Sequence, residues 1–587
     1  EEGYHLTEDL VDKAISFVAD AKQVAPDKPF FMYFAPGAMH APHHVRKEWS
    51  DKYKGQFDEG WDVYREKTFA RQKELGLIPA DAELSRHDPD VAPWDSLSAD
   101  EKRLYAHMMA VFAGFMEHTD YHMGRLFDFL KSLGEFDNTL IMLVSDNGAS
   151  SEGGPTGSVN ETLFFNNVKE DLATNLAHID ELGDPTTFNH YPWGWTWAGN
   201  TPFRRWKRET YRGGICDPFI MHFPNGFEAR GEVRSQYAHV IDMMPTVLDL
   251  IGLEPPTSIK GVAQSPIEGV SFATALDDTS AESKHHTQYF EMLGHRSIYH
   301  NGWRAVCPWP GPSFAEAGTG FGNPIPAEKL TELDAKGWEL YHIAEDFAEN
   351  HNIAEGNLAK LIEMIATWYV EAGKYNVLPV DGRGVQRAAD DRPQLTRDRT
   401  HYTFYPHTQA VPDNAGPRLL NRTHSIAADV DIPAEGAQGA LVSCGGVDAG
   451  YAFYMKDNKL HYVHNYVARD YLQVASTVPV PAGRHELRFE FEVTGQPDFA
   501  NGKGTPGRAQ LYIDGKLVGQ ADFPHTTPFM FGVTSAISVG ADPGAPVTPF
   551  YEPPFEFTGT IHSVTFDVSG DVIRDSEAEM RMIMARQ

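Results

Sequence analysis

The chain has 587 residues, of which 41% are hydrophobic, and a formal net charge of −32 at pH 7. Its length suits two substantial cores rather than one, and its hydrophobic share is typical of globular proteins. Such an acidic chain disfavours nucleic acid and anionic lipid, because both bind clusters of Lys and Arg. We therefore expect no nucleic-acid partner. Because no apolar run is long enough to span a bilayer, we expect no membrane partner either.

The cysteines do not predict a fold held together by disulfides or by a metal bound to cysteine. The three cysteines, Cys216, Cys307 and Cys444, are far apart, and none belongs to a C-x-x-C pair. A set of disulfides or a zinc site built on cysteines is therefore not expected.

The chain enters a helix almost at once. Thr7 is the expected N-cap, Glu8 and Asp9 lie in the first turn, and an apolar stripe at helical spacing runs from Leu10 to Val18. A helix that needs a partner surface from its first turn suggests that the start of a domain lies upstream of Glu1.

Strand-like and helix-like segments then alternate. Residues 29–35, 139–145 and 218–223 are short apolar runs, as expected for strands buried on both faces, and residues 100–133 and 242–251 predict helices. This order favours an α/β domain with a parallel sheet covered on both faces. Two polar stretches, roughly 45–100 and 151–200, read as insertions.

The rest of the chain divides further. Residues 285–375 predict an α+β piece, with a strand at 300–306 and a closing helix at 358–372, and residues 376–400 predict a linker. From 401 to 570, short alternating strands and an Asp514-Gly515 hairpin turn predict a β-sandwich, followed by a tail at 571–587. The expected sandwich strands are 424–432, 439–444, 451–455, 460–466, 487–493, 511–513, 516–518, 535–539 and 559–568.

The sharpest chemical motif is Asp146-Asn147-Gly148, directly after the run 139–145. Ligands of open α/β sheets bind beyond the carboxyl ends of strands, and hard oxygen donors suit Ca²⁺ or Mg²⁺. The alternative is an ordinary turn, because D-N-G is a common turn tripeptide.

A histidine loop follows the first apolar run. His40 stands five residues beyond Ala35, where an imidazole can hydrogen-bond an anionic ester or protonate a leaving oxygen. A plain surface histidine, or a zinc cluster with His43 and His44, are the alternatives.

A third motif gathers cations on this acidic chain. The segment 201–215 contains Lys207 and four arginines before Gly213-Gly214. An oxyanion substrate needs such donors, although a loop whose cations pair with neighbouring acids would have the same composition.

Taken in their order, these motifs resemble the sulfatases of the alkaline phosphatase superfamily, and most of all the large bacterial arylsulfatases. The segments that carry this resemblance are PFFMYFAPGAMH (29–40), LIMLVSDNGAS (140–150), P-x-R-x-x-K…GGI (202–215), IDMMPTVL (241–248), WELY (338–341) and HNIA (351–354). The resemblance spans roughly residues 3–375. It implies a mixed sheet flanked by helices over 1–284, incomplete at its N-terminus, and a sulfatase C-terminal subdomain over 285–375. The sandwich at 401–570 resembles the concanavalin A-like jelly rolls.

The resemblance also implies roles for the site residues. Asp146 and Asn147 would be two ligands of one Ca²⁺, and His40 and Lys207 would contact sulfate oxygens, with His40 assisting the leaving group. The activity implied is release of sulfate from a small-molecule or glycan sulfate monoester. The nucleophile in this family is a formylglycine made from a cysteine in C-x-[PA]-x-R.

The sequence departs from the family pattern at the nucleophile. None of its cysteines, and no serine, lies in that motif, and the paired aspartates that complete the metal site are absent. We therefore expect an N-terminally truncated chain that is inactive alone, with roughly 150 to 200 residues and the remaining Ca²⁺ ligands upstream of Glu1.

Two other functions compete with a sulfatase. A phosphodiesterase or phosphonate monoester hydrolase of the same superfamily shares the metal motif, and the residue at the nucleophile position separates the two. A glycan-binding protein that acts through the sandwich is the third possibility. The choice among aryl, sugar and alkyl sulfates, the compartment and the oligomeric state stay open.

Overall fold

A computed structural model describes residues 3–228, 230–308, 327–380, 399–412, 415–532 and 535–573. The chain forms two compact units, each assembled from separate segments. Unit 1 comprises Glu1–His40, Trp49–Ser151 and Pro192–Arg383, and unit 2 comprises Ala41–Glu48, Glu152–Tyr191 and Gly384–Gln587. Most of the expected linker and tail, at 381–398 and 574–587, lies outside the described residues.

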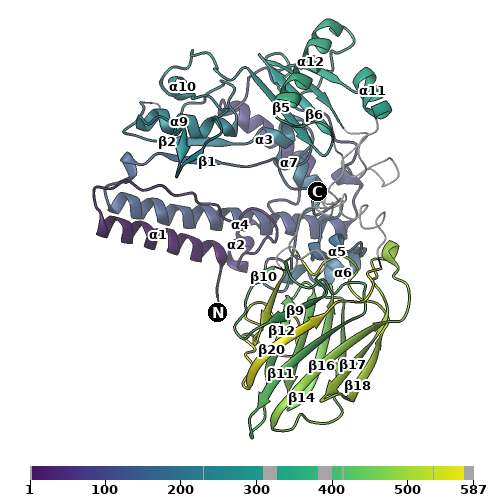
Figure 1. The fold of residues 1–587 in the computed structure, drawn as a ribbon. Helices are drawn as coiled ribbons and strands as arrows, with labels where there is room; N and C mark the ends of the chain where they lie inside the picture. Colours follow the sequence, from purple (N-terminus) through teal and green to yellow (C-terminus); the bar gives the residue numbers. More distant parts are fainter. Residues whose placement is uncertain are drawn as a thin grey trace. The chain divides into compact units, whose positions relative to one another are not determined.

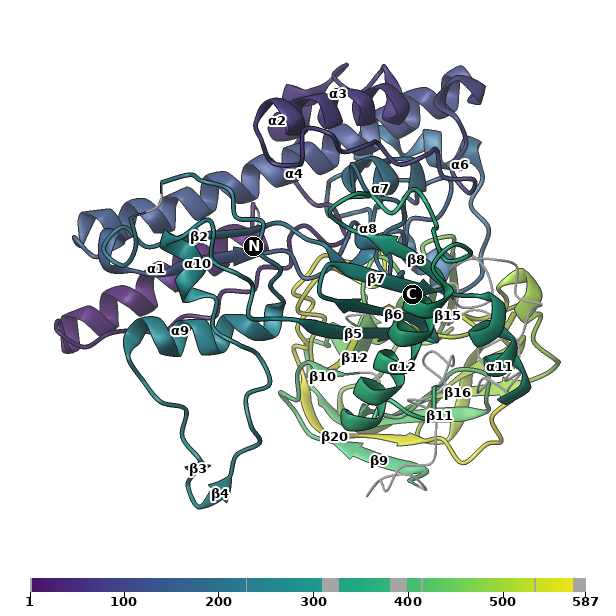
Figure 2. The same ribbon diagram turned by 90° about the horizontal axis from the view of Figure 1, so that it is seen from above.

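Two long helices run side by side at one edge of unit 1 (Figures 1 and 2). They are α1 (Leu6–Val24) and α4 (Ala99–Ser132). Ser98 and Glu101 form a capping box at the start of α4, which confirms the predicted long helix. The N-cap of α1 is His5 rather than the expected Thr7, because His5 has the extended backbone of a cap and Thr7 is already buried inside the helix.

The expected parallel sheet is wrong for the described residues, since every ladder between named strands there is antiparallel. β1 (Ile141–Val144) pairs antiparallel with β2 (Phe219–His222). Residues 29–35 belong to no helix and join no ladder among the described residues. An apolar run indicates an extended buried segment, but the direction and presence of a neighbouring strand depend on distant parts of the chain.

The expected burial on both faces is also wrong for these strands. Met32 and Phe34 pack against α1 and α4, whereas Phe31 and Tyr33 are 84% and 86% exposed. Ile220 of β2 is 60% exposed. In the segment 29–35 one face is covered and the other is open, whereas β1 and β2 are half-buried at one end of their ladder and exposed at the other.

A four-stranded antiparallel sheet follows in unit 1, in the order β5-β6-β7-β8. Its strands are β5 (Thr287–Met292), β6 (His295–His300), β7 (Trp303–Cys307) and β8 (Glu339–His342). α12 (Leu358–Lys374) packs on it through the buried Met364 and Trp368, as the predicted closing helix requires. The expected strand 300–306 is instead the end of β6, a turn at Asn301-Gly302, and β7, because both turn residues adopt positive φ.

The other elements of unit 1 are mostly short. They are α3 (Gly60–Glu74), η2 (Trp94–Ser96), η3 (Phe136–Asn138), α7 (Trp193–Gly199), α8 (Arg212–Ile215), η5 (Val240–Asp242), α9 (Met243–Ile251), β3 (Ser258–Ile259), β4 (Val262–Ala263), α10 (Ala273–Asp277) and α11 (Ala327–Lys336). α2 (Lys47–Ser50) and η1 (Asp51–Tyr53) precede α3. The stretch expected as an insertion at 45–100 therefore contains helices, and the buried Trp61 and Trp94 pack edge to face within it.

Unit 2 contains the predicted β-sandwich. Its two six-stranded antiparallel sheets have the orders β10-β19-β12-β13-β14-β15 and β18-β17-β16-β11-β20-β9. The strands are β9 (His401–Phe404), β10 (Val411–Pro412), β11 (His424–Ile432), β12 (Gly439–Gly445), β13 (Gly450–Lys456), β14 (Lys459–Tyr466), β15 (Asp470–Ala475), β16 (Gly483–Val493), β17 (Gly507–Ile513), β18 (Lys516–Phe523), β19 (Ala536–Val539) and β20 (Thr560–Asp567). All the expected strands are present, while β9, β10 and β15 were not predicted.

Alternation along the strands builds the core of this sandwich. β11 alternates buried and half-exposed positions along its whole length, and Phe489 stacks on Tyr462 with ring centroids 3.5 Å apart. The predicted hairpin turn is confirmed, because Asp514 and Gly515 both adopt positive φ between β17 and β18.

The segment 152–191 belongs to unit 2 rather than to unit 1. It contains α5 (Glu161–Phe165), α6 (Leu172–Ala177) and η4 (Ile179–Glu181), and η7 (Phe499–Asn501) lies in the sandwich region. Leu163 joins the sandwich core, and Asn166 donates from Nδ2 to the carbonyl oxygen of Met530 at 3.0 Å. Chain inserted into the first half of the sequence therefore helps to complete the second folded unit.

All three cysteines are unbridged, Cys216 exposed and the other two buried. Among the described residues, no helix has the length and apolar character needed to cross a membrane.

Candidate functional site

The loop that follows β1 lies tightly against the loop that leads into β2. Ser145 N donates to Pro218 O and Gly148 N donates to Gly214 O, both at 3.2 Å. A Cβ on Gly148 would lie 1.8 Å from the carbonyl oxygen of Gly213. Only glycine permits this approach, so Gly148 sets the position of the adjoining Asp146 and Asn147.

Two of the predicted residues are in direct contact. Lys207 Nζ lies 3.3 Å from His40 Nε2, although the two residues are separated by 167 positions. The lysine ammonium has donors and no acceptor, so it donates to the ring nitrogen in this arrangement. His40 is exposed and Lys207 is half-buried, which places the pair where a solute can reach it.

Backbone contacts join this pair to the Asp-Asn loop. Lys207 N donates to Ala149 O at 3.2 Å, and Ala149 N donates to Asn200 Oδ1 at 2.9 Å. Asn200 also donates from Nδ2 to Arg205 O at 3.0 Å. Asn200 therefore links the loop 145–149 to the segment that presents Lys207, and the His40, Lys207 and Asp-Asn segments form one connected region of unit 1.

The Asp-Asn turn presents oxygen atoms beside a second carboxyl group. Asp146 is exposed, and the amide nitrogen of Asn147 donates to Gly148 O at 3.0 Å, so its amide oxygen is the atom that a cation would use. Burial, together with the neighbouring Asp146 carboxylate, raises the pKa of Asp217 from 3.8 to about 7. Two carboxyl groups that repel each other, with an amide oxygen alongside, suit a hard divalent cation.

The arginines of the basic segment serve mainly as internal structure. Arg205 Nη1 lies 3.2 Å from Asp88 and 2.8 Å from Asp90, with the Arg205 and Asp88 side chains largely buried. Arg204 Nη1 donates to the Tyr341 hydroxyl at 3.2 Å. Arg204 and Arg205 therefore pair inside the protein, as the alternative of a basic loop predicts. Lys207 reaches the His40 loop, and its role as a donor to an oxyanion stays a prediction.

Sequence reasoning missed two features. Asp217 had no local signal, because it approaches Asp146 only through the pairing of β1 with β2. The second feature lies elsewhere in unit 1. Among the described residues, the one group of three His, Cys, Asp or Glu side chains with metal-binding spacing is His5, Glu8 and His118. Its local signal was the spacing of His5 and Glu8, three residues apart at the start of α1, whereas His118 joins them only through the packing of α4.

Comparison with known proteins finds similarity over part of the chain. The Sulfatase family model matches residues 1–253. An uncharacterized sulfatase of Schizosaccharomyces pombe is 29% identical over 382 residues, covering 62% of this chain and 61% of that protein. An arylsulfatase of Klebsiella aerogenes is 28% identical over 254 residues, covering 43% of this chain and 52% of that protein. The chain thus spans only about half to three fifths of these curated relatives.

Similar solved structures are more distant. The crystal structure of Ps i-CgsB in complex with k-i-k-neocarrahexaose is 20% identical, with a TM-score of 0.38, and covers 66% of this chain and 59% of that one.

Proposed function

We propose that the whole protein, meaning this chain with any further sequence that its gene encodes, hydrolyses sulfate monoesters. Residues 1–253 carry a sulfatase-family domain. The observation that supports the site assignment most directly is the contact between Lys207 Nζ and His40 Nε2 at 3.3 Å. A cation and an imidazole at a solvent-accessible position, next to a loop of oxygen donors, match the requirements of an anionic ester.

We further propose that Asp146 and Asn147 hold one Ca²⁺. Their oxygen atoms and the repulsion between Asp146 and Asp217 suit such an ion. Asp217 is either an additional ligand or a nearby acid that the ion's charge keeps ionised. When bound, Ca²⁺ would supply positive charge near the reacting ester.

His40 and Lys207 act on the ester itself in this proposal. Lys207 turns its N–H donors from the ring of His40 to the sulfate oxygens, where negative charge is retained as the S–O bond breaks. His40, protonated at Nε2, gives its proton to the departing alkoxide or phenoxide oxygen. The family resemblance implies a formylglycine nucleophile, and the given sequence does not contain its C-x-[PA]-x-R motif.

The test is turnover of the whole protein with 4-nitrophenyl sulfate, compared with bis(4-nitrophenyl) phosphate and a phosphonate monoester. We expect sulfate release to be preferred, and Lys207→Ala to lower kcat/KM for the sulfate by about 100-fold. Lys13→Ala, which removes an exposed lysine of α1, is the matched control and should leave turnover unchanged.

Three outcomes would overturn the proposal. Preferential hydrolysis of the phosphodiester or the phosphonate would make the protein a relative with different chemistry. Equal turnover in the Lys207→Ala and Lys13→Ala variants would remove Lys207 from the site. If no ester is cleaved while the protein binds sulfated polysaccharide, the glycan-binding alternative is correct.

A further inference from the structure

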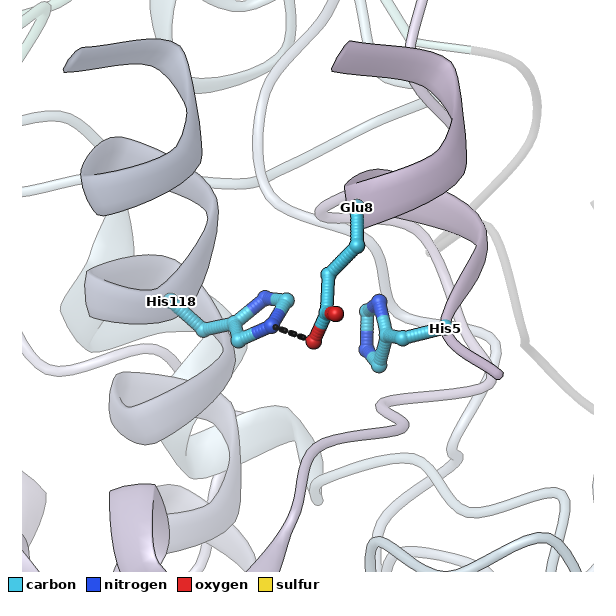
Figure 3. A group of neighbouring side chains, drawn as sticks. All are labelled: His5, Glu8 and His118. Carbon is cyan, nitrogen blue, oxygen red and sulfur yellow. Dashed lines mark hydrogen bonds and ion pairs between the residues drawn. The ribbon is translucent and has the colours of Figure 1, made fainter. Parts of the chain in front are cut away.

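A compact group of metal-binding side chains joins the start of α1 to the middle of α4. One ligand atom from each of His5, Glu8 and His118 lies within 4.8 Å of the others. Figure 3 shows the Glu8 carboxylate between the two imidazole rings. His118 projects from α4, and His5 is the N-cap residue of α1. The ring centroids of His5 and His118 are 4.2 Å apart.

We propose that His5, Glu8 and His118 form a Zn²⁺ site in unit 1. Two imidazole nitrogens and one carboxylate oxygen are a common ligand set for zinc, which completes four-fold coordination with water. Ca²⁺ prefers sites made of oxygen atoms, so this group selects a different ion from the Asp146-Asn147 loop. The proposal does not depend on the proposed sulfatase function.

The three side chains are held in place by separate parts of the structure. His5 accepts the Thr7 backbone N–H at Nδ1, 3.2 Å away, which fixes it at the first turn of α1. His118 is completely buried, and the ring of Trp49 meets it edge to face at 5.3 Å. α1 and α4 pack along each other and therefore set the separation of these residues without an ion. A metal would find two of its three ligands on rigid helices.

The two ring nitrogens of His118 lie in different surroundings. Its Nε2 lies 3.1 Å from Glu8 Oε1 and donates to it, while Nδ1 is buried and has no hydrogen-bond partner in the described part of the chain. Because no described group bonds to Nδ1, the ring proton can move from Nε2 to Nδ1 when an ion binds at Nε2.

His122 supports the group from the next turn of α4. Its Nε2 lies 3.8 Å from Glu8 Oε1, and its Nδ1 accepts from Arg125 at 2.9 Å. We infer that His122 orients the Glu8 carboxylate and does not bind the metal itself, since neighbours that hold a ligand in place strengthen metal binding. Glu8 is half-buried, so the site is accessible to an entering ion from its side.

The test is Zn²⁺ binding to the 587-residue chain. The protein is prepared without a histidine tag, stripped with a chelator and titrated by calorimetry, and Co²⁺ is used in place of Zn²⁺ for visible absorption. We expect one Zn²⁺ per chain and the intense Co²⁺ bands of a four-coordinate site. His118→Gln and Glu8→Gln should each weaken binding by about tenfold or more, because even neighbours of metal ligands change affinity by that factor.

A matched control uses another histidine–glutamate pair. His178 Nδ1 lies 2.7 Å from Glu181 Oε2 on the surface, and this pair belongs to no three-residue group among the described residues. His178→Gln should keep the wild-type Zn²⁺ affinity. Far-UV circular dichroism checks the fold of each variant. If His118→Gln misfolds, Glu8→Gln decides, because glutamine has nearly the same shape as glutamate.

Three results would overturn the proposal: no saturable binding of Zn²⁺ by the wild-type chain, wild-type affinity in both Glu8→Gln and His118→Gln, or an equal loss of affinity in His178→Gln. In each case the three side chains would be a hydrogen-bonded contact between two helices. Since the readout is Zn²⁺ affinity and not ester turnover, such a failure leaves the proposed sulfatase function untouched.

Discussion

Replacing Gly148 by alanine tests how closely the loop 145–149 must approach the loop at 213–214. The new Cβ would lie 1.8 Å from Gly213 O, 2.9 Å from Gly213 C and 3.0 Å from Gly214 Cα. All three contacts are with backbone, so no side chain can rotate away. One of the two loops must move by about 1 Å or more before the contacts become acceptable.

The cost can be worked from these contacts. Overpacking against a fixed neighbour destabilises a protein by about 1–3 kcal/mol. The movement also strains the hydrogen bond from Gly148 N to Gly214 O, 3.2 Å long, whose loss costs about 1 kcal/mol. We therefore expect Gly148→Ala to lower the free energy of unfolding of unit 1 by roughly 2–4 kcal/mol.

Urea unfolding followed by tryptophan fluorescence is the assay. All eleven tryptophans fall within the ranges that form unit 1, so the signal reports this unit. The control is Gly124→Ala in α4, where an added Cβ meets no atom of the described residues within 4 Å. Because alanine is the better helix former, this control should stabilise the protein by about 0.5–1 kcal/mol. A Gly148→Ala variant within about 0.5 kcal/mol of wild type would refute the argument from close approach.

Two further predictions concern buried charge and buried histidine. Arg205→Met should destabilise unit 1 by about 3 kcal/mol, because it leaves Asp88 buried without its cation. In the same urea assay, the double variant with Asp88→Asn should lose less free energy of unfolding than the sum of the two single changes. Strictly additive losses would argue against an interaction between Arg205 and Asp88. Acid should destabilise the sandwich, because burial lowers the pKa of His464 from 6.5 to about 3 and that of His424 to about 4. The unfolded chain then binds more protons, so stability should fall by a few kcal/mol as the pH drops from about 6.5 toward 4. Hydrogen exchange of the β14 amides measures this loss, His464→Gln should reduce it, and a profile unchanged by that substitution would contradict the assignment.

Patterns between neighbouring residues predicted most of the secondary structure. The long helix α4 follows from its apolar spacing and its Ser98 cap, and β11 matches the predicted strand 424–432 at both ends. These features depend on contacts within a few residues, which the sequence contains directly. The sequence also singled out His40 and Lys207, which the structure brings into contact.

The tertiary structure alone decided how these elements combine. It paired β1 with β2 antiparallel, left one face of the segment 29–35 exposed, and placed residues 152–191 with the sandwich. It also gave Arg205 an internal acidic partner while Lys207 contacts His40. It brought Asp217 near Asp146 and His118 near Glu8. Each of these depends on residues far apart in the chain, whose distances are set by packing and not by local sequence. Residue types show what chemistry a segment can support, and the packing decides which of those side chains meet.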